Sequence, residues 1–165
     1  MRKMDYNGIV LCKFQANLFK NFMKYASCSP SVFIRRFMNS MVAKRFDDLE
    51  VLRENISFVS VFNELDEQYG LTAFGDPNKV DPEILYWTGY LYRYWSYTRE
   101  ISSSLLYQKL KPEELFKRYY IYHSMDMDYV IERIIEEKEL SFPEVNEKRT
   151  LEQILADFVE YYKDK

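Results

Sequence analysis

The segment from Asp81 to Glu100 constrains the fold of this chain more than any other. It opens with Asp81, Pro82 and Glu83, which supply a capping side chain, a proline suited to the first helical position and an acid in the first turn. At about 100° per residue, its apolar and aromatic residues cover half the circumference of a helix: Ile84, Tyr86, Trp87, Tyr90, Leu91, Tyr94, Trp95 and Tyr97. A helix with so wide an apolar arc packs against several neighbours. We therefore expect it to be the central helix of the core, with a second helix approaching closely at Gly89 and Ser96.

Most of the remaining chain also places its apolar residues at helical intervals. Ser29 before Pro30 predicts a helix start, and Gly70 predicts a helix end. Further helices are predicted near residues 103–110, 112–122 and 126–139, and from a capping box at Thr150. Ile9–Phe14 is β-prone and favours a short N-terminal strand. The predicted fold class is all-α, or nearly so: a compact bundle of about six or seven helices around the central aromatic helix.

Charge is divided unevenly along the chain. Residues 1–46 carry nine basic side chains and one acid, whereas residues 47–165 carry fourteen basic and twenty-five acidic side chains, and the whole chain has a net charge of −3. The change occurs at Asp47 and Asp48, which we take as a seam between a basic N-terminal subregion and an acidic helical body within one compact unit. A cationic surface suits an anionic partner, and an acidic body suits a basic one.

The chain contains no recognisable catalytic or metal-binding motif. His123 is its single histidine, Cys12 and Cys28 have no metal-ligand spacing, and its four glycines are isolated rather than gathered in a phosphate-binding loop. We expect no enzymatic activity, no cofactor and no metal. Two cysteines without a disulfide pattern fit a reducing compartment, and no apolar run is long enough for a membrane span, so we expect a cytoplasmic protein.

Residues 9–44 resemble a ribbon-helix-helix module. The resemblance lies in Ile9–Phe14, the helical spacing that follows it, and the pattern Ser29-x-Ser31-x-x-Ile34-Arg35. It implies a homodimeric DNA-binding repressor whose paired strands enter the major groove. Two features depart from the family: the turn is about three residues shorter, and Ile9 and Leu11 are poor readers of base edges. The candidate nucleic-acid-binding residues are Lys13, Arg35, Arg36, Lys44 and Arg45.

The whole chain also resembles small helical, antitoxin-like proteins of Firmicutes, through the stretches Phe33–Ser40 and Tyr86–Trp95. The resemblance implies a non-catalytic inhibitor that binds another protein and blocks its active surface. Tyrosines of the aromatic helix that remain at the surface would favour such a protein interface. An alternative is a phage-encoded inhibitor of a defence nuclease, of the anti-CRISPR type, whose acids mimic DNA phosphates. For either partner the candidate contacts are Asp47, Asp48, Glu50, Glu132, Glu136, Glu137 and Glu139.

Overall fold

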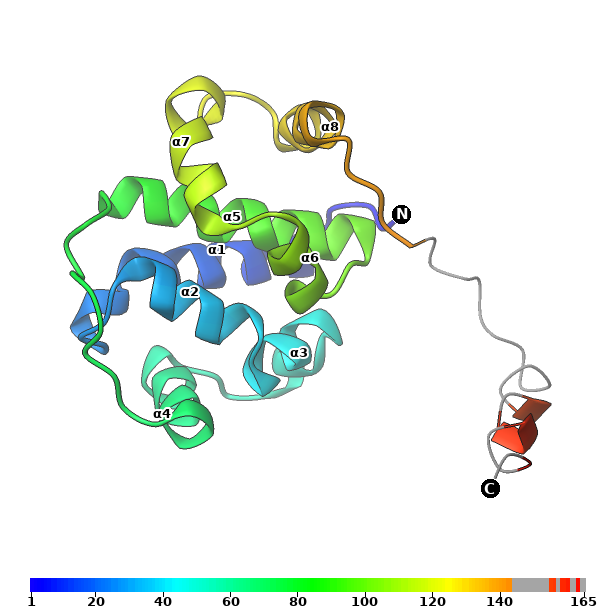
Figure 1. Ribbon diagram of the computed structural model, residues 1–165, viewed down its shortest axis with the longest axis horizontal. Helices are drawn as coiled ribbons and strands as arrows, with labels where there is room; N and C mark the ends of the chain where they lie inside the picture. The colour runs from blue at the N-terminus through cyan, green and yellow to red at the C-terminus, as the bar shows by residue number, and fades with distance from the viewer. Residues whose placement is uncertain (144–154, 157, 161–162, 164–165) are drawn as a thin grey trace.

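The computed structural model describes residues 1–143, 155–156, 158–160 and 163. All regular secondary structure in these residues is helical, which confirms the all-α prediction (Figure 1). The helix expected to open at Thr150 begins outside the described residues. In chain order the elements are α1 (Tyr6–Lys20), η1 (Phe22–Lys24), α2 (Pro30–Met38), α3 (Met41–Asp47), η2 (Glu50–Arg53), α4 (Phe58–Tyr69), α5 (Pro82–Arg99), α6 (Ser103–Lys109), α7 (Pro112–Tyr122) and α8 (Met127–Lys138).

The N-terminal strand prediction is wrong, because Ile9–Phe14 lies in the middle of α1. Asp5 caps this helix by accepting a 2.9 Å hydrogen bond from the backbone N–H of Gly8. The buried residues then recur at helical spacing: Gly8, Leu11, Cys12, Gln15, Ala16, Leu18 and Phe19. Burial of this face outweighs the local preference of Ile9 and Val10 for extended backbone.

The predicted helix boundaries at Ser29, Gly70 and Asp81 are confirmed. The Ser29 hydroxyl accepts from the backbone N–H of Val32 at the start of α2, and the Asp81 carboxylate accepts from that of Glu83 at the start of α5. Gly70 ends α4 with φ of 79°, a left-handed value that glycine adopts without strain. Local capping chemistry therefore sets these boundaries.

Helix α5 contacts α1, α6, α7 and α8, and Figure 1 shows it between α1 on one side and α7 and α8 on the other. Trp87, Leu91 and Trp95 are buried together in the core, as their spacing predicts. The close approach predicted at Gly89 is also observed, because an added Cβ would lie 2.8 Å from the backbone oxygen of Gln15 in α1. Side chains larger than hydrogen at this position would push α1 and α5 apart.

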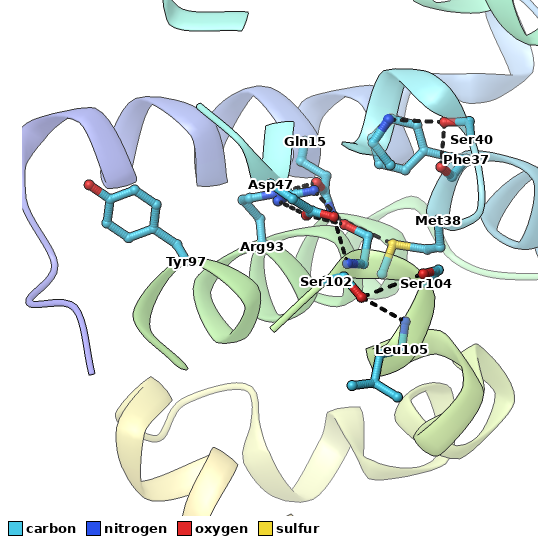
Figure 2. A network of polar contacts seen from close by, with 12 residues as sticks. Gln15, Phe37, Met38, Ser40, Asp47, Arg93, Tyr97, Ser102, Ser104 and Leu105 are labelled. Atoms are coloured by element: carbon cyan, nitrogen blue, oxygen red, sulfur yellow. Dashed lines mark hydrogen bonds and ion pairs between the residues drawn. The ribbon is translucent and has the colours of Figure 1, made fainter. Parts of the chain in front are cut away.

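A largely buried ion pair joins Arg93 of α5 to Asp47 of α3. The guanidinium of Arg93 donates to Asp47 at 2.7 Å, to the Gln15 amide oxygen at 2.7 Å and to the Ser103 hydroxyl at 2.9 Å. Asp47 also accepts from the backbone N–H and the hydroxyl of Ser103. Figure 2 shows Gln15, Asp47 and Arg93 converging from separate helices. The network joins α1, α3, α5 and the start of α6.

The basic N-terminal subregion packs on the acidic body through ion pairs. Arg2 pairs with Glu100 at 3.2 Å, Lys20 with Glu83 at 2.9 Å, and Arg45 with both Glu54 and Glu64. Each of these pairs joins a cation from residues 1–46 to an acid from the remaining chain. Three of the nine basic side chains of residues 1–46 are thus paired within the molecule.

Replacing Asp47 with alanine should lower the free energy of unfolding by about 3–5 kcal/mol, because it leaves the buried Arg93 charge without its partner. Urea denaturation of the purified protein measures this change. The matched control is Asp48→Ala: the neighbouring acid is exposed, so its loss should change stability by about 0.5 kcal/mol or less. Equal effects of the two substitutions would show that the network does not stabilise the fold.

Candidate functional site

The predicted acidic contacts fall into two groups. Asp48, Glu50 and Glu139 are exposed and form no side-chain hydrogen bond or ion pair with any described residue. The other four are paired with arginines: Asp47 with Arg93, Glu132 with Arg99, Glu136 with Arg133, and Glu137 with Arg118. A carboxylate paired with an arginine presents less net charge to a partner. Fewer of the predicted acids are therefore unpaired than the sequence alone implies.

Several of the acids on α8 hold that helix in place. Glu132 joins α8 to α5 through Arg99, and Glu137 joins it to α7 through Arg118 and the Tyr122 hydroxyl. Tyr94 of α5 adds a hydrogen bond of 3.0 Å to Asp128. The hydrogen bond from Tyr122 holds the pKa of Glu137 below its ordinary value of 4.5. These carboxylates contribute to the packing of α8.

The predicted basic contacts are spread over three helices. Lys13 on α1, Arg35 on α2 and Lys44 on α3 are exposed. Arg45 lies between Glu54 and Glu64, and Arg36 is half-buried, with its guanidinium over the Tyr69 ring and bonded to the Gly70 carbonyl. A ribbon-helix-helix module needs a strand at Ile9–Phe14, which is helical here. The structure therefore does not gather these cations on a strand pair that could read DNA.

A cavity of about 440 Å³ opens between the segment that joins η1 to α2, the helices α2 and α4, and the loop that follows Gly70. Its aromatic surface comes from Phe33, Phe62 and Tyr25: Phe33 and Phe62 stack with centroids 5.3 Å apart, and Tyr25 stacks on Phe62 at 5.0 Å. Ala26, Leu65 and Ala73 complete most of the apolar lining. The volume and apolar character match those of sites that bind small molecules or partner side chains. We call this cavity the aromatic pocket.

The loop beside the aromatic pocket holds two large apolar side chains in solvent. Leu71 is 87% exposed and Phe74 is 76% exposed. The loop is fixed to the start of α2, because Ser29 donates its backbone N–H to the Phe74 carbonyl at 2.9 Å. Gly75 also packs on Ser29, and an added Cβ would collide with the serine side chain. Its φ of 86° is a left-handed value that glycine adopts without strain. Leu71 lines the pocket, and Phe74, which does not, follows it on the same loop; we call these two residues the rim.

Two opposite charges lie within the aromatic pocket. Arg36 comes from α2 and Asp66 from α4. Asp66 is half-buried, and its carboxylate forms no hydrogen bond or ion pair with any described residue. Cys28 also lines the pocket, but burial raises the pKa of its thiol, which keeps it protonated and poorly nucleophilic at neutral pH. The pocket is therefore equipped for noncovalent binding.

Among the described residues, no cluster of three or more His, Cys, Asp and Glu side chains could hold a metal ion. His123 is exposed and stacks on Tyr119 with ring centroids 4.6 Å apart, away from the aromatic pocket. Within the same residues, no helix has the length and apolarity needed to cross a membrane.

The aromatic pocket was not predicted from the sequence. Leu71–Val80 has the glycine, proline and asparagine typical of a loop, and nothing local shows that it folds beside Phe33 and Phe62. The one signal in the sequence was the presence of two large apolar residues, Leu71 and Phe74, in a loop rich in turn-forming residues. Comparison with protein-family models, curated proteins and solved structures finds no match to this chain.

Replacing Glu137 with glutamine should destabilise the protein at neutral pH, because the anion then no longer accepts from Tyr122 and Arg118. Since folding lowers the pKa of Glu137 from 4.5, its stabilising effect is complete above that pH and is lost as the pH falls below it. The stability difference between wild type and Glu137→Gln should therefore shrink in acid, as measured by urea denaturation at neutral pH and well below pH 4.5. Glu139→Gln is the control, and a pH-independent difference for Glu137→Gln would contradict the assignment.

Proposed function

We propose that this protein is a non-catalytic, antitoxin-like regulator that binds another protein and blocks its active surface. The observation that carries the proposal is the aromatic pocket with Leu71 and Phe74 exposed on the adjoining loop. Exposed apolar groups around a concave apolar site are typical of protein interfaces, where a few buried anchors supply most of the binding energy. In this proposal α5 is the central aromatic helix of a rigid body that presents the pocket.

A protein partner explains the exposure of Leu71 and Phe74 better than a small ligand does. A ligand confined to the 440 Å³ cavity would leave Phe74, which does not line it, in water. A partner surface would cover Leu71 and Phe74 while one of its side chains enters the pocket. Burial of a Leu or Phe side chain contributes about 1.5–3 kcal/mol, so these two residues supply a large share of a specific interaction.

The alternatives have less support. A DNA mimic needs many free carboxylates, yet Glu132, Glu136 and Glu137 are paired with arginines. A ribbon-helix-helix repressor needs a strand where α1 lies. Both remain testable by salt-dependent binding, because phosphate contacts weaken steeply as salt rises. Free thiols at Cys12 and Cys28 fit the proposed cytoplasmic location.

The double substitution Leu71→Asp/Phe74→Asp should weaken partner binding by at least about thirtyfold, because hot-spot residues contribute about 2 kcal/mol or more. Affinity capture from the native host, with mass spectrometry of the bound proteins, identifies the partner. Titration of the purified pair then gives the affinities, and an activity assay of the partner tests inhibition.

Ile121→Asp is the matched control, since Ile121 is 63% exposed on α7 and does not line the aromatic pocket. It should leave binding unchanged. A partner that binds wild type and the double variant equally would show that the aromatic pocket is not the interface. Failure to capture any protein that the wild type inhibits would contradict the proposed function itself.

A further inference from the structure

We infer, on the basis of the proposed function, that the aromatic pocket recognises a partner segment carrying a large apolar side chain next to a lysine or arginine. The apolar side chain packs on Phe33 and Phe62, and the cation pairs with Asp66. The proposed function requires only that a protein binds at this site, without either of these two side chains being specified.

The apolar part of the recognition rests on the pocket lining. Phe33 and Phe62 present stacked rings, and Tyr25 extends the stack to the pocket edge. An aromatic or long aliphatic side chain gains the most from contact with such rings. At 440 Å³ the pocket is also larger than one side chain needs, so residues flanking the anchor come close to its charged groups.

The requirement for a cation rests on Asp66. Asp66 is half-buried, lines the pocket beside apolar groups, and its carboxylate has no hydrogen bond or ion pair with any described residue. The carboxylate is therefore free to pair with a cation of the binding segment, and apolar groups of the pocket keep such a pair from being as fully hydrated as one on an open surface. No hydrogen bond or ion pair joins Asp66 to Arg36, the other charged residue of the pocket.

Arg36 has a different role because it is already held in place. One of its N–H groups donates to the Gly70 carbonyl, and its guanidinium lies 5.4 Å from the centre of the Tyr69 ring. A guanidinium has five N–H donors, so the remaining ones can bind a main-chain carbonyl of the partner segment. Asp66 then selects the side chain, while Arg36 binds a group that every peptide has.

A displayed library of random peptides, selected against the folded protein, tests the inference without knowledge of the natural partner. The wild type should enrich peptides that have a large apolar residue with lysine or arginine within two positions. Selection against Asp66→Asn should retain the apolar residue and lose the basic one. Glu67→Gln, which changes the next and exposed acid of α4, should give the wild-type result.

One enriched peptide, labelled and titrated by fluorescence anisotropy, gives the size of the effect. Asp66→Asn should weaken its binding about tenfold, as expected for loss of a charged hydrogen bond, and Glu67→Gln should leave it unchanged. The inference would be overturned if the peptides whose binding depends on Leu71 lacked a basic residue or carried an acidic one. That result would leave the proposed function standing. Absence of any peptide whose binding depends on Leu71 or Phe74 would count against both.

Discussion

The buried pair of Arg93 and Asp47 is the interaction on which the arrangement of the helices most depends. Arg93 is 1% exposed, so its charge is stable in the core only because Asp47, Gln15 and Ser103 together accept its hydrogen bonds. These partners come from α1, α3 and the start of α6. Any shift of one helix relative to α5 would leave a buried charge unpaired, and the network therefore fixes the relative positions of four helices.

Ion pairs nearer the surface also join the two differently charged parts of the chain. Cations at Arg2, Lys20 and Arg45 meet acids that follow residue 47, so opposite charge on the two parts of the chain favours their packing. Individual surface pairs contribute little to stability, but like charges at these positions would repel. Part of the charge pattern that suggests an external partner in the sequence is therefore used in contacts inside the molecule.

Features of the fold that depend on neighbouring residues were predictable, whereas those that depend on distant ones were not. The caps at Ser29 and Asp81 and the close approach at Gly89 follow from local chemistry and helical spacing. The pairing of Asp47 with Arg93 joins residues 46 positions apart, which no local pattern reveals. The strand prediction for residues 9–14 was wrong for a related reason. Packing against α5, rather than local preference, decides the conformation of this segment. The aromatic pocket likewise forms only when α2, α4 and the loop after Gly70 meet.

Phe33 connects the stable core to the aromatic pocket. In the core its ring stacks on Phe22, with ring centroids 5.2 Å apart, and contacts the Phe19 ring at 5.3 Å. In the pocket it stacks on Phe62. Because the ring is 2% exposed and held by core residues, the floor of the pocket is preformed by the fold. Preformed sites avoid the entropy cost of ordering side chains on binding. Leu71 and Phe74, by contrast, are exposed on the surface loop, so a substitution there changes the surface beside the pocket without loss of the core.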